Sequence, residues 1–277
     1  MRRWPTFLTL TFLSRCVAVF VLLTPPLQAQ VGEEVPFITT PDNVTLAMLN
    51  LAGVRRSDHV IDLGSGDGRI VITAARRFGA SGLGVEIVPD LVLKSRASAQ
   101  QAGVHGRVEF REQDLFKTDL SAATVITMYL LPEVNLQLRP ALLQLAPGTR
   151  IVSHDWDMGD WLPDQTLTVA APDKKIGREK LSRLHRWVVP ARADGLWCGP
   201  QRTQLRLVQR YQQLQAQWSK GAGEQDRQWT LHGQLNGRQL RLAGAEFSLQ
   251  GLVMDDQLRL TTHPTLRRAA GAACPAG

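Results

Sequence analysis

The chain has 277 residues, of which 44% are hydrophobic and 21% are charged. These values are typical of a globular protein large enough to bury a core, and they exclude a disordered or fibrous chain. The 32 Lys and Arg residues outnumber the 25 Asp and Glu residues, so the formal net charge is +7. This excess is mild, whereas dedicated nucleic-acid-binding proteins carry a dense stripe of basic residues. We therefore predict no specific nucleic-acid partner.

The first 29 residues have the pattern of a targeting segment. Residues 1–15 carry three arginines and no acid, residues 16–23 form a short apolar run, and Ala29 offers a small residue for cleavage. This order is typical of a secretory signal peptide. Alternatively, the same segment is an uncleaved anchor that associates with the membrane. Residues 1–29 therefore predict export to the bacterial envelope, as a periplasmic or membrane-anchored protein. The alternative is a cytoplasmic protein with a fortuitously apolar start.

Cysteine usage is compatible with export. Cys16 lies in the predicted leader, which leaves Cys198 and Cys274 to form one disulfide in an oxidising compartment. The sequence contains no CxxC pair, so no zinc or redox motif is indicated. The closely spaced acids of residues 154–160 are interpreted as solvated or capping groups, and we predict no metal site.

Residues 41–152 alternate between helix-like and strand-like segments. Apolar residues recur at helical spacing over residues 45–51, 69–78, 91–102 and 135–145. Short apolar runs predict strands over residues 59–63, 82–87, 107–111, 124–131 and 149–153, with a further strand of the same sheet at 184–189. Regular alternation of this kind predicts an α/β fold with a doubly wound, mostly parallel, Rossmann-like sheet.

From residue 196 onward the apolar residues alternate with period 2. Asn236 and Gly237 lie between two alternating runs, which is a strong signal for a β-hairpin, and Asp255 with Asp256 indicates a second one. A change of phase near Gln212 predicts a β-bulge. This part of the chain is predicted to be a small antiparallel β module.

The first strand-to-helix turn, residues 60–69 (VIDLGSGDGR), concentrates the functional signals. Its glycines allow a sharp turn and close approach of a ligand to the backbone. The GxGxG spacing differs from the GxGxxG of dinucleotide-binding folds. Asp62 and Asp67 place carboxylates around the loop, which would repel a diphosphate and attract a cationic ammonium or sulfonium.

Further polar and aromatic residues fall at the carboxyl ends of the next predicted strands. Glu86 ends the second strand, where an acid can accept both hydroxyls of an adenosine ribose. After the third strand, Asp114 is placed to accept from an adenine amino group, while Leu115 and Phe116 cover the ring. Tyr129 follows the fourth strand, where a reacting group would be presented. Open α/β sheets bind their ligands at this edge.

Taken together, residues 36–161 resemble the class I S-adenosylmethionine-dependent methyltransferases. More narrowly, residues 36–41 (PFITTP), 62–70 (DLGSGDGRI) and 114–116 (DLF) resemble the small protein-lysine methyltransferases whose mitochondrial members modify the ADP/ATP carrier and the c-ring protein of ATP synthase. The Asn/Asp-Pro-Pro-Tyr/Phe box of amino-methylating nucleic-acid enzymes is absent.

The resemblance implies S-adenosyl-L-methionine as cofactor, covered by residues 37–41. The predicted cofactor-binding residues are Phe37, Thr40, Pro41, Asp62, Gly64, Ser65, Gly66, Asp67, Gly68, Glu86, Asp114 and Leu115. It also implies a protein partner whose lysine side chain is the methyl acceptor. That lysine, with an ordinary pKa of about 10.4, must lose a proton before it attacks. Tyr129 and Asp155 are the candidate catalytic residues lining its pocket.

Four regions are thus expected: a leader (1–29), a methyltransferase domain (30–190), a β-rich module (191–266) and a disordered tail (267–277). The chain departs from the family pattern after the fourth strand, in the leader and in the β module. Two other functions therefore stay open: a small-molecule methyltransferase, and an exported binding module that keeps the fold without turnover. The leader favours the latter, because S-adenosylmethionine is made in the cytosol.

Overall fold

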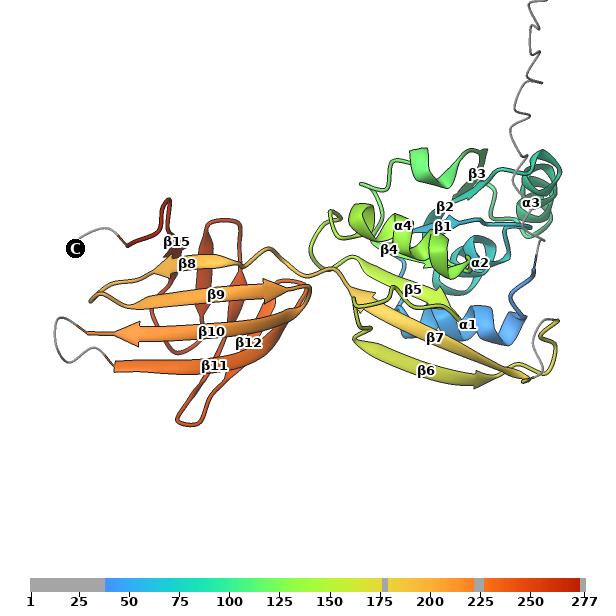
Figure 1. Cartoon of the computed structure of the whole chain (residues 1–277). Helices are drawn as coiled ribbons and strands as arrows, with labels where there is room; N and C mark the ends of the chain where they lie inside the picture. Colours follow the sequence, from blue (N-terminus) through green and yellow to red (C-terminus); the bar gives the residue numbers. More distant parts are fainter. Residues whose placement is uncertain (1–37, 176–178, 222–226, 275–277) are drawn as a thin grey trace, which may run out of the picture. The chain divides into compact units, whose positions relative to one another are not determined.

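The computed structural model describes residues 38–175, 179–221 and 227–274 (Figure 1). The predicted leader and Phe37 lie outside these ranges, as do residues 275–277 of the predicted tail.

A seven-stranded sheet with the order β3-β2-β1-β4-β5-β7-β6 forms the first half of the fold. Its strands are β1 (His59–Leu63), β2 (Ser81–Glu86), β3 (Val108–Glu112), β4 (Val125–Met128), β5 (Arg150–His154), β6 (Gln165–Ala170) and β7 (Leu181–Val188). The first five strands are parallel, whereas β7 pairs antiparallel with both β5 and β6. The doubly wound fold class is therefore confirmed. The sequence gives no signal for β6, because it is a polar, largely exposed edge strand.

Helices cover both faces of this sheet. They are α1 (Asp42–Leu51), α2 (Arg69–Thr73), η1 (Ala74–Phe78), α3 (Pro89–Gln101), η2 (Leu115–Lys117) and α4 (Pro132–Leu142). Leu138 of α4 packs in one core cluster with Ile61, and Met48 of α1 packs in another with Val60. Because neighbouring residues of a strand point to opposite faces, the two clusters lie on opposite sides of β1. The sheet is thus the middle layer of three.

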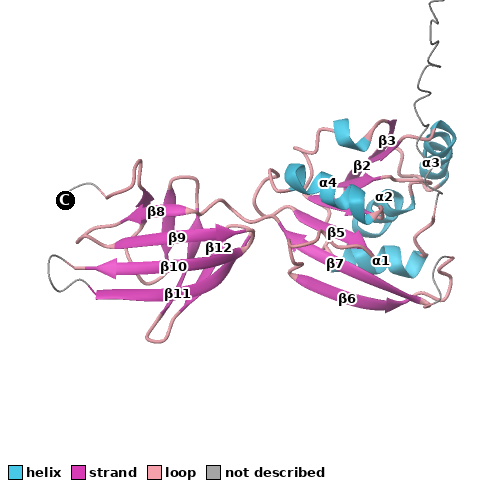
Figure 2. Cartoon of the chain, in the orientation of Figure 1, coloured by secondary structure: helices cyan, strands magenta, loops and turns pink. Residues whose placement is uncertain are grey.

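The second half is a closed antiparallel barrel built from consecutive strands, and among the described residues it contains strands and loops without helices (Figure 2). The strands are β8 (Gly195–Cys198), β9 (Gln204–Arg210), β10 (Gln213–Lys220), β11 (Arg227–Asn236), β12 (Gln239–Ala243), β13 (Ser248–Val253), β14 (Gln257–Leu260) and β15 (Leu266–Arg268). Trp197, Trp218 and a set of leucines are buried inside it. The predicted antiparallel module therefore has its own core.

Both predicted hairpins of the module are confirmed. Asn236 pairs with Gln239, and Gly237 takes a φ of +57° in the turn between them; Val253 pairs with Leu258 in the second hairpin. The predicted bulge near Gln212 is wrong. Arg210 pairs with Gln213, so the phase change comes from a two-residue turn between β9 and β10.

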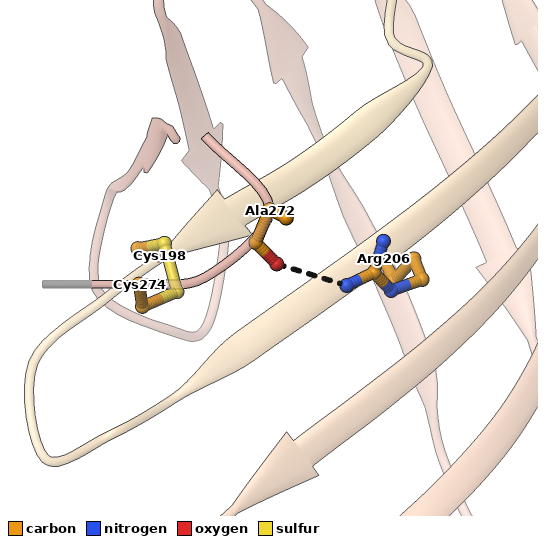
Figure 3. Close-up of a disulfide and its surroundings, with 4 residues drawn as sticks. All are labelled: Cys198, Arg206, Ala272 and Cys274. Carbon is orange, nitrogen blue, oxygen red and sulfur yellow. Dashed lines mark hydrogen bonds between the residues drawn. A yellow bond between two sulfur atoms is a disulfide. The ribbon is translucent and has the colours of Figure 1, made fainter. Parts of the chain in front are cut away.

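A disulfide between Cys198 and Cys274, with Cα atoms 5.6 Å apart, joins β8 to the last described residue (Figure 3). Arg206 also donates a hydrogen bond to the carbonyl oxygen of Ala272 at 3.4 Å. The segment preceding Cys274 differs from the expected disordered tail, because strand pairing at β15 and the disulfide hold it. Among the described residues, no helix is both long and apolar enough to cross a membrane.

Candidate active site

The loop after β1 turns through three glycines with positive φ angles. The amides of Gly64 and Ser65 both donate to the carbonyl of Val85 on β2, at 3.0 and 2.9 Å. Gly68 has a φ of +78°, and a Cβ there would lie 2.7 Å from the ring of Phe110. Only glycine therefore fits at position 68, directly before α2. The loop therefore makes the sharp turn that the spacing of its glycines predicts.

Glu86, at the end of β2, holds this loop through its side chain. Its Oε2 accepts from the amide of Gly66 at 2.9 Å, and its Oε1 accepts from the amides of Ile87 and Val88 at 2.8 and 3.1 Å. A carboxylate has about four acceptor positions, so Oε2 keeps capacity for one further hydrogen bond. One position is thus left for a ligand hydroxyl, and the predicted acceptance of both ribose hydroxyls by Glu86 stays a prediction.

Asp62 lies beneath the loop and is almost completely buried, with 2% of its surface exposed. The hydroxyl of Thr127 donates to its Oδ1 at 2.7 Å. Burial, assisted by the negative charges of Glu86 and Asp67, raises the pKa of Asp62 to about 8, despite the opposing effect of Thr127. At neutral pH the protonated form of this carboxyl is therefore favoured, and a nearby cation would favour the charged form.

Asp67 is ion-paired rather than free. Arg69 donates to its two oxygens at 2.9 and 2.7 Å, and although burial opposes this, the pairing keeps the pKa of Asp67 below its usual range. The predicted attraction of a cation to Asp67 is therefore largely offset by Arg69. The same guanidinium donates to the carbonyl of Thr40 at 2.8 Å. Arg69 is not among the predicted site residues. Its position directly after Gly68, the last glycine of the loop, is the sequence feature that could have indicated it.

The remaining predicted cofactor residues have more local roles in the unliganded chain. Asp114 caps η2, because its Oδ1 accepts from the amide of Phe116 at 2.9 Å. Leu115 packs against the core of the sheet, and Phe116 is 45% exposed. The buried hydroxyl of Ser65 has no hydrogen-bond partner among the described residues. Contacts of these residues with an adenosyl group stay a prediction.

At the carboxyl ends of β4 and β5, Tyr129 and Asp155 meet. The hydroxyl of Tyr129 donates to Oδ2 of Asp155 at 3.4 Å, and its ring stacks on that of His154 with centroids 3.9 Å apart. Burial and the charge of Asp155 raise the pKa of Tyr129 to about 12, so the phenol stays protonated. The structure thus brings both candidate catalytic residues together.

His154, which is not among the predicted site residues, lies against the ring of Tyr129. It is fully buried, and burial lowers its pKa to about 4, so the ring is neutral. Its Nε2 hydrogen-bonds the hydroxyl of Ser182 at 2.8 Å, and its Nδ1 hydrogen-bonds the hydroxyl of Thr40 at 3.3 Å. Thr40 therefore hydrogen-bonds His154 through its side chain and Arg69, which follows the glycine loop, through its backbone carbonyl.

Asp155 is held in an unusual backbone conformation, with a φ of +64°. Its amide donates to the carbonyl of Arg183 at 2.6 Å, and its Oδ1 accepts from the amide of Arg183 at 3.0 Å. The ammonium of Lys174 lies 2.6 Å from its Oδ2. Although burial opposes it, this hydrogen bond from Lys174 lowers the pKa of Asp155, which is therefore a carboxylate. Lys174 is a further site residue that the sequence does not predict.

Comparison with known proteins agrees with this geometry. The sequence model of the ANTKMT methyltransferase domain matches residues 62–165. A protein-lysine N-methyltransferase of Saccharolobus islandicus is 43% identical over 137 residues, which cover 49% of this chain and 85% of that protein. The lysine N-methyltransferase of the ATP synthase c-ring protein in Homo sapiens is 32% identical over 186 residues, which cover 64% of this chain and 79% of that protein.

Solved structures are similar as well. A crystal structure described as an RNA methyltransferase from Salinibacter ruber, in complex with S-adenosyl-L-homocysteine, is 52% identical with a TM-score of 0.52, and covers 56% of this chain and 96% of that chain. With the sheet and loop described above, these similarities define an S-adenosylmethionine-dependent methyltransferase.

Within that class, the chain belongs to the family of the ANTKMT methyltransferase domain. The match to that domain ends at residue 165, so the barrel lies outside it.

S-adenosylmethionine supplies a methyl group on a cationic sulfonium, and the residues present fit such a ligand. The glycine loop takes positive φ angles at Gly64, Gly66 and Gly68, and Oε2 of Glu86 keeps one acceptor position for a hydroxyl. A cation close to Asp62 would stabilise the carboxylate form and so lower the pKa that burial raises. The binding of the cofactor by these residues, and of the acceptor beside Tyr129 and Asp155, stays a prediction.

Asp62→Asn should flatten the dependence of stability on pH. The folded pKa of about 8 exceeds the ordinary value of 3.8, so the stability that Asp62 contributes is fully present below pH 3.8 and lost as the pH rises to about 8. Relative to the variant, the free energy of unfolding of the wild type should fall by roughly 1.4 kcal/mol per pH unit across this interval. Urea denaturation at pH 5, 6, 7 and 8 measures this difference. Parallel curves for the two proteins would contradict the buried protonated carboxyl.

Proposed function

We propose that this methyltransferase transfers methyl groups to lysine side chains of a protein. Support comes from the curated relatives named protein-lysine N-methyltransferases, at 43% and 32% identity. The observation that carries the proposal is the meeting of Tyr129 and Asp155 at the edge of the sheet where the cofactor loop lies. An acid and a phenol at that edge suit an alkyl-ammonium, which donates hydrogen bonds and carries a positive charge.

None of the polar groups at the acceptor end is a strong base at neutral pH. Tyr129 is protonated, Asp155 has a lowered pKa, and His154 has a pKa of about 4. These groups therefore bind and orient the acceptor, and the lysine ammonium loses its proton to solvent before attack. The amine nitrogen then bonds to the methyl carbon while the carbon–sulfur bond breaks. Proximity and orientation account for the rate acceleration.

Exposed apolar side chains beside the acceptor end favour a macromolecular acceptor. Leu131 is 43% exposed and Trp156 is 44% exposed. Buried Asn135 fastens their two loops together, since its amide nitrogen donates to the carbonyl of Leu131 and its side chain donates to that of Trp156. Apolar groups held rigidly at a surface are suited to contact with another protein.

Incubation of the purified protein with cell extract and methyl-labelled S-adenosylmethionine tests the acceptor class. We expect label in protein that survives ribonuclease, with methyl-lysine found by mass spectrometry. Tyr129→Phe, which removes the hydroxyl that contacts Asp155, should lower the rate by about tenfold, since an oriented hydrogen bond is lost. Label found only in small molecules, or cofactor binding with no transfer, would contradict the proposal.

RNA is the second candidate acceptor, because the 52% identical crystal structure is described as an RNA methyltransferase. Label that is removed by ribonuclease and resists protease in the same experiment would favour RNA. The mild basic excess and the absence of an Asn/Asp-Pro-Pro-Tyr/Phe box make protein the preferred acceptor.

For location, we propose an exported protein, periplasmic or anchored by its N-terminal segment. The leader pattern of residues 1–29 supports this, and so does the Cys198–Cys274 disulfide, since stable disulfides are rare in cytosolic proteins. Cell fractionation with thiol alkylation before lysis should recover the protein in the envelope fraction with both cysteines blocked from alkylation. Recovery in the cytosol with Cys198 and Cys274 as free thiols would contradict export.

A further inference from the structure

A lysine of the chain itself already occupies the acceptor end of the site. The ammonium of Lys174 lies 2.6 Å from Oδ2 of Asp155 and donates to the carbonyl of Leu181 at 2.7 Å. Its side chain is only 12% exposed. The oxygen of Asp155 that it contacts is the same one that accepts from Tyr129. Tyr129 and Lys174 therefore both contact Oδ2 of Asp155.

The contact explains how Asp155 is kept charged in the unliganded chain. A partly buried carboxylate without a counter-charge is costly, and removing one partner of such a pair leaves the other uncompensated. Lys174 supplies that counter-charge with the same chemical group, a primary ammonium on an alkyl chain, that a protein lysine would bring. Its backbone amide donates to the carbonyl of Ala171 in a turn, and its backbone carbonyl accepts from the ammonium of Lys180 at 2.6 Å.

We infer that Lys174 holds the place of the acceptor lysine, and that a substrate lysine exchanges with it at Asp155 before methyl transfer. This inference rests on the proposed lysine methyltransferase function. While it is paired with Asp155, Lys174 is an ammonium without a free electron pair, so it is an occupant of the site and not an acceptor. We accordingly expect Asp155 to bind primary alkyl-ammonium ions.

A purely structural role for Lys174 leads to different expectations. If Lys174 only orients Asp155 and Tyr129, its removal should weaken both ammonium binding and catalysis. If it competes with the acceptor lysine, its removal should strengthen ammonium binding and lower the KM for the protein substrate. Lys174→Met keeps the length of the side chain and removes the charge. The neighbouring exposed Lys175 offers a matched control as Lys175→Met, which removes the same charge outside the site.

Binding of n-butylammonium to the full chain, loaded with S-adenosyl-L-homocysteine, can be measured by isothermal titration calorimetry. We expect Lys174→Met to bind it at least about tenfold more tightly than the wild type, and Lys175→Met to bind like the wild type. Asp155→Asn should lose binding, and because asparagine tolerates positive φ angles, its backbone should persist. Unchanged or weaker binding by Lys174→Met, with an unfolding midpoint close to that of the wild type, would overturn the exchange.

Parallel methylation assays separate this inference from the function on which it rests. Lysine methylation by the wild type, with an unchanged KM and unchanged n-butylammonium affinity in Lys174→Met, would overturn the exchange and leave the function standing. Tighter n-butylammonium binding by Lys174→Met, without lysine methylation by any variant, would support the ammonium site and contradict the proposed acceptor.

Discussion

The carboxylate of Glu86 is the constraint on which the cofactor end of the site depends. It accepts hydrogen bonds from Gly66 in the loop after β1 and from Ile87 and Val88 just before α3. Two loops that leave neighbouring strands are thereby held at a fixed separation. Ile87 and Val88 directly precede the first residue of α3, and a negative group at this end of a helix is favoured by the helix dipole.

Charge balance is the second theme of the site. Three acids of the site are balanced in different ways: Asp67 by Arg69, Asp155 by Lys174, and Asp62 by a proton, which its raised pKa favours. Both ligands of a lysine methyltransferase, a sulfonium cofactor and an ammonium acceptor, bring positive charge. Under the proposed function, these carboxylates would pair with cationic ligands in place of their internal partners.

The sequence predicts the parts of the site that lie close together along the chain. The strand at 59–63, the glycine loop and Glu86 at the end of the next strand follow from apolar runs and spacing. The meeting of Tyr129 and Asp155 is predictable too, because the carboxyl ends of parallel strands share one edge. Thr40 is predicted from the family resemblance, and in the structure it hydrogen-bonds both His154 and Arg69.

Other features depend on tertiary contacts that no local pattern encodes. Lys174 reaches Asp155 only because β6 and β7 fold back along β5, and β6 is a polar edge strand without an apolar signal. Barrel closure depends on β15, which has three residues. The change of apolar phase near Gln212 predicts a bulge, whereas the structure has a turn in which Tyr211 takes a φ of +54°, a conformation that tyrosine rarely adopts.

The most direct test of the central claim is a calorimetric titration of S-adenosylmethionine into the wild type, Glu86→Ala and Glu109→Gln. Glu109 pairs with Arg111 on the exposed side of β3 and serves as a control for loss of a surface carboxylate. We predict binding by the wild type and the control with equal affinity, and binding at least about tenfold weaker by Glu86→Ala at an unchanged circular dichroism spectrum. Equal affinity in all three proteins would contradict the role of Glu86.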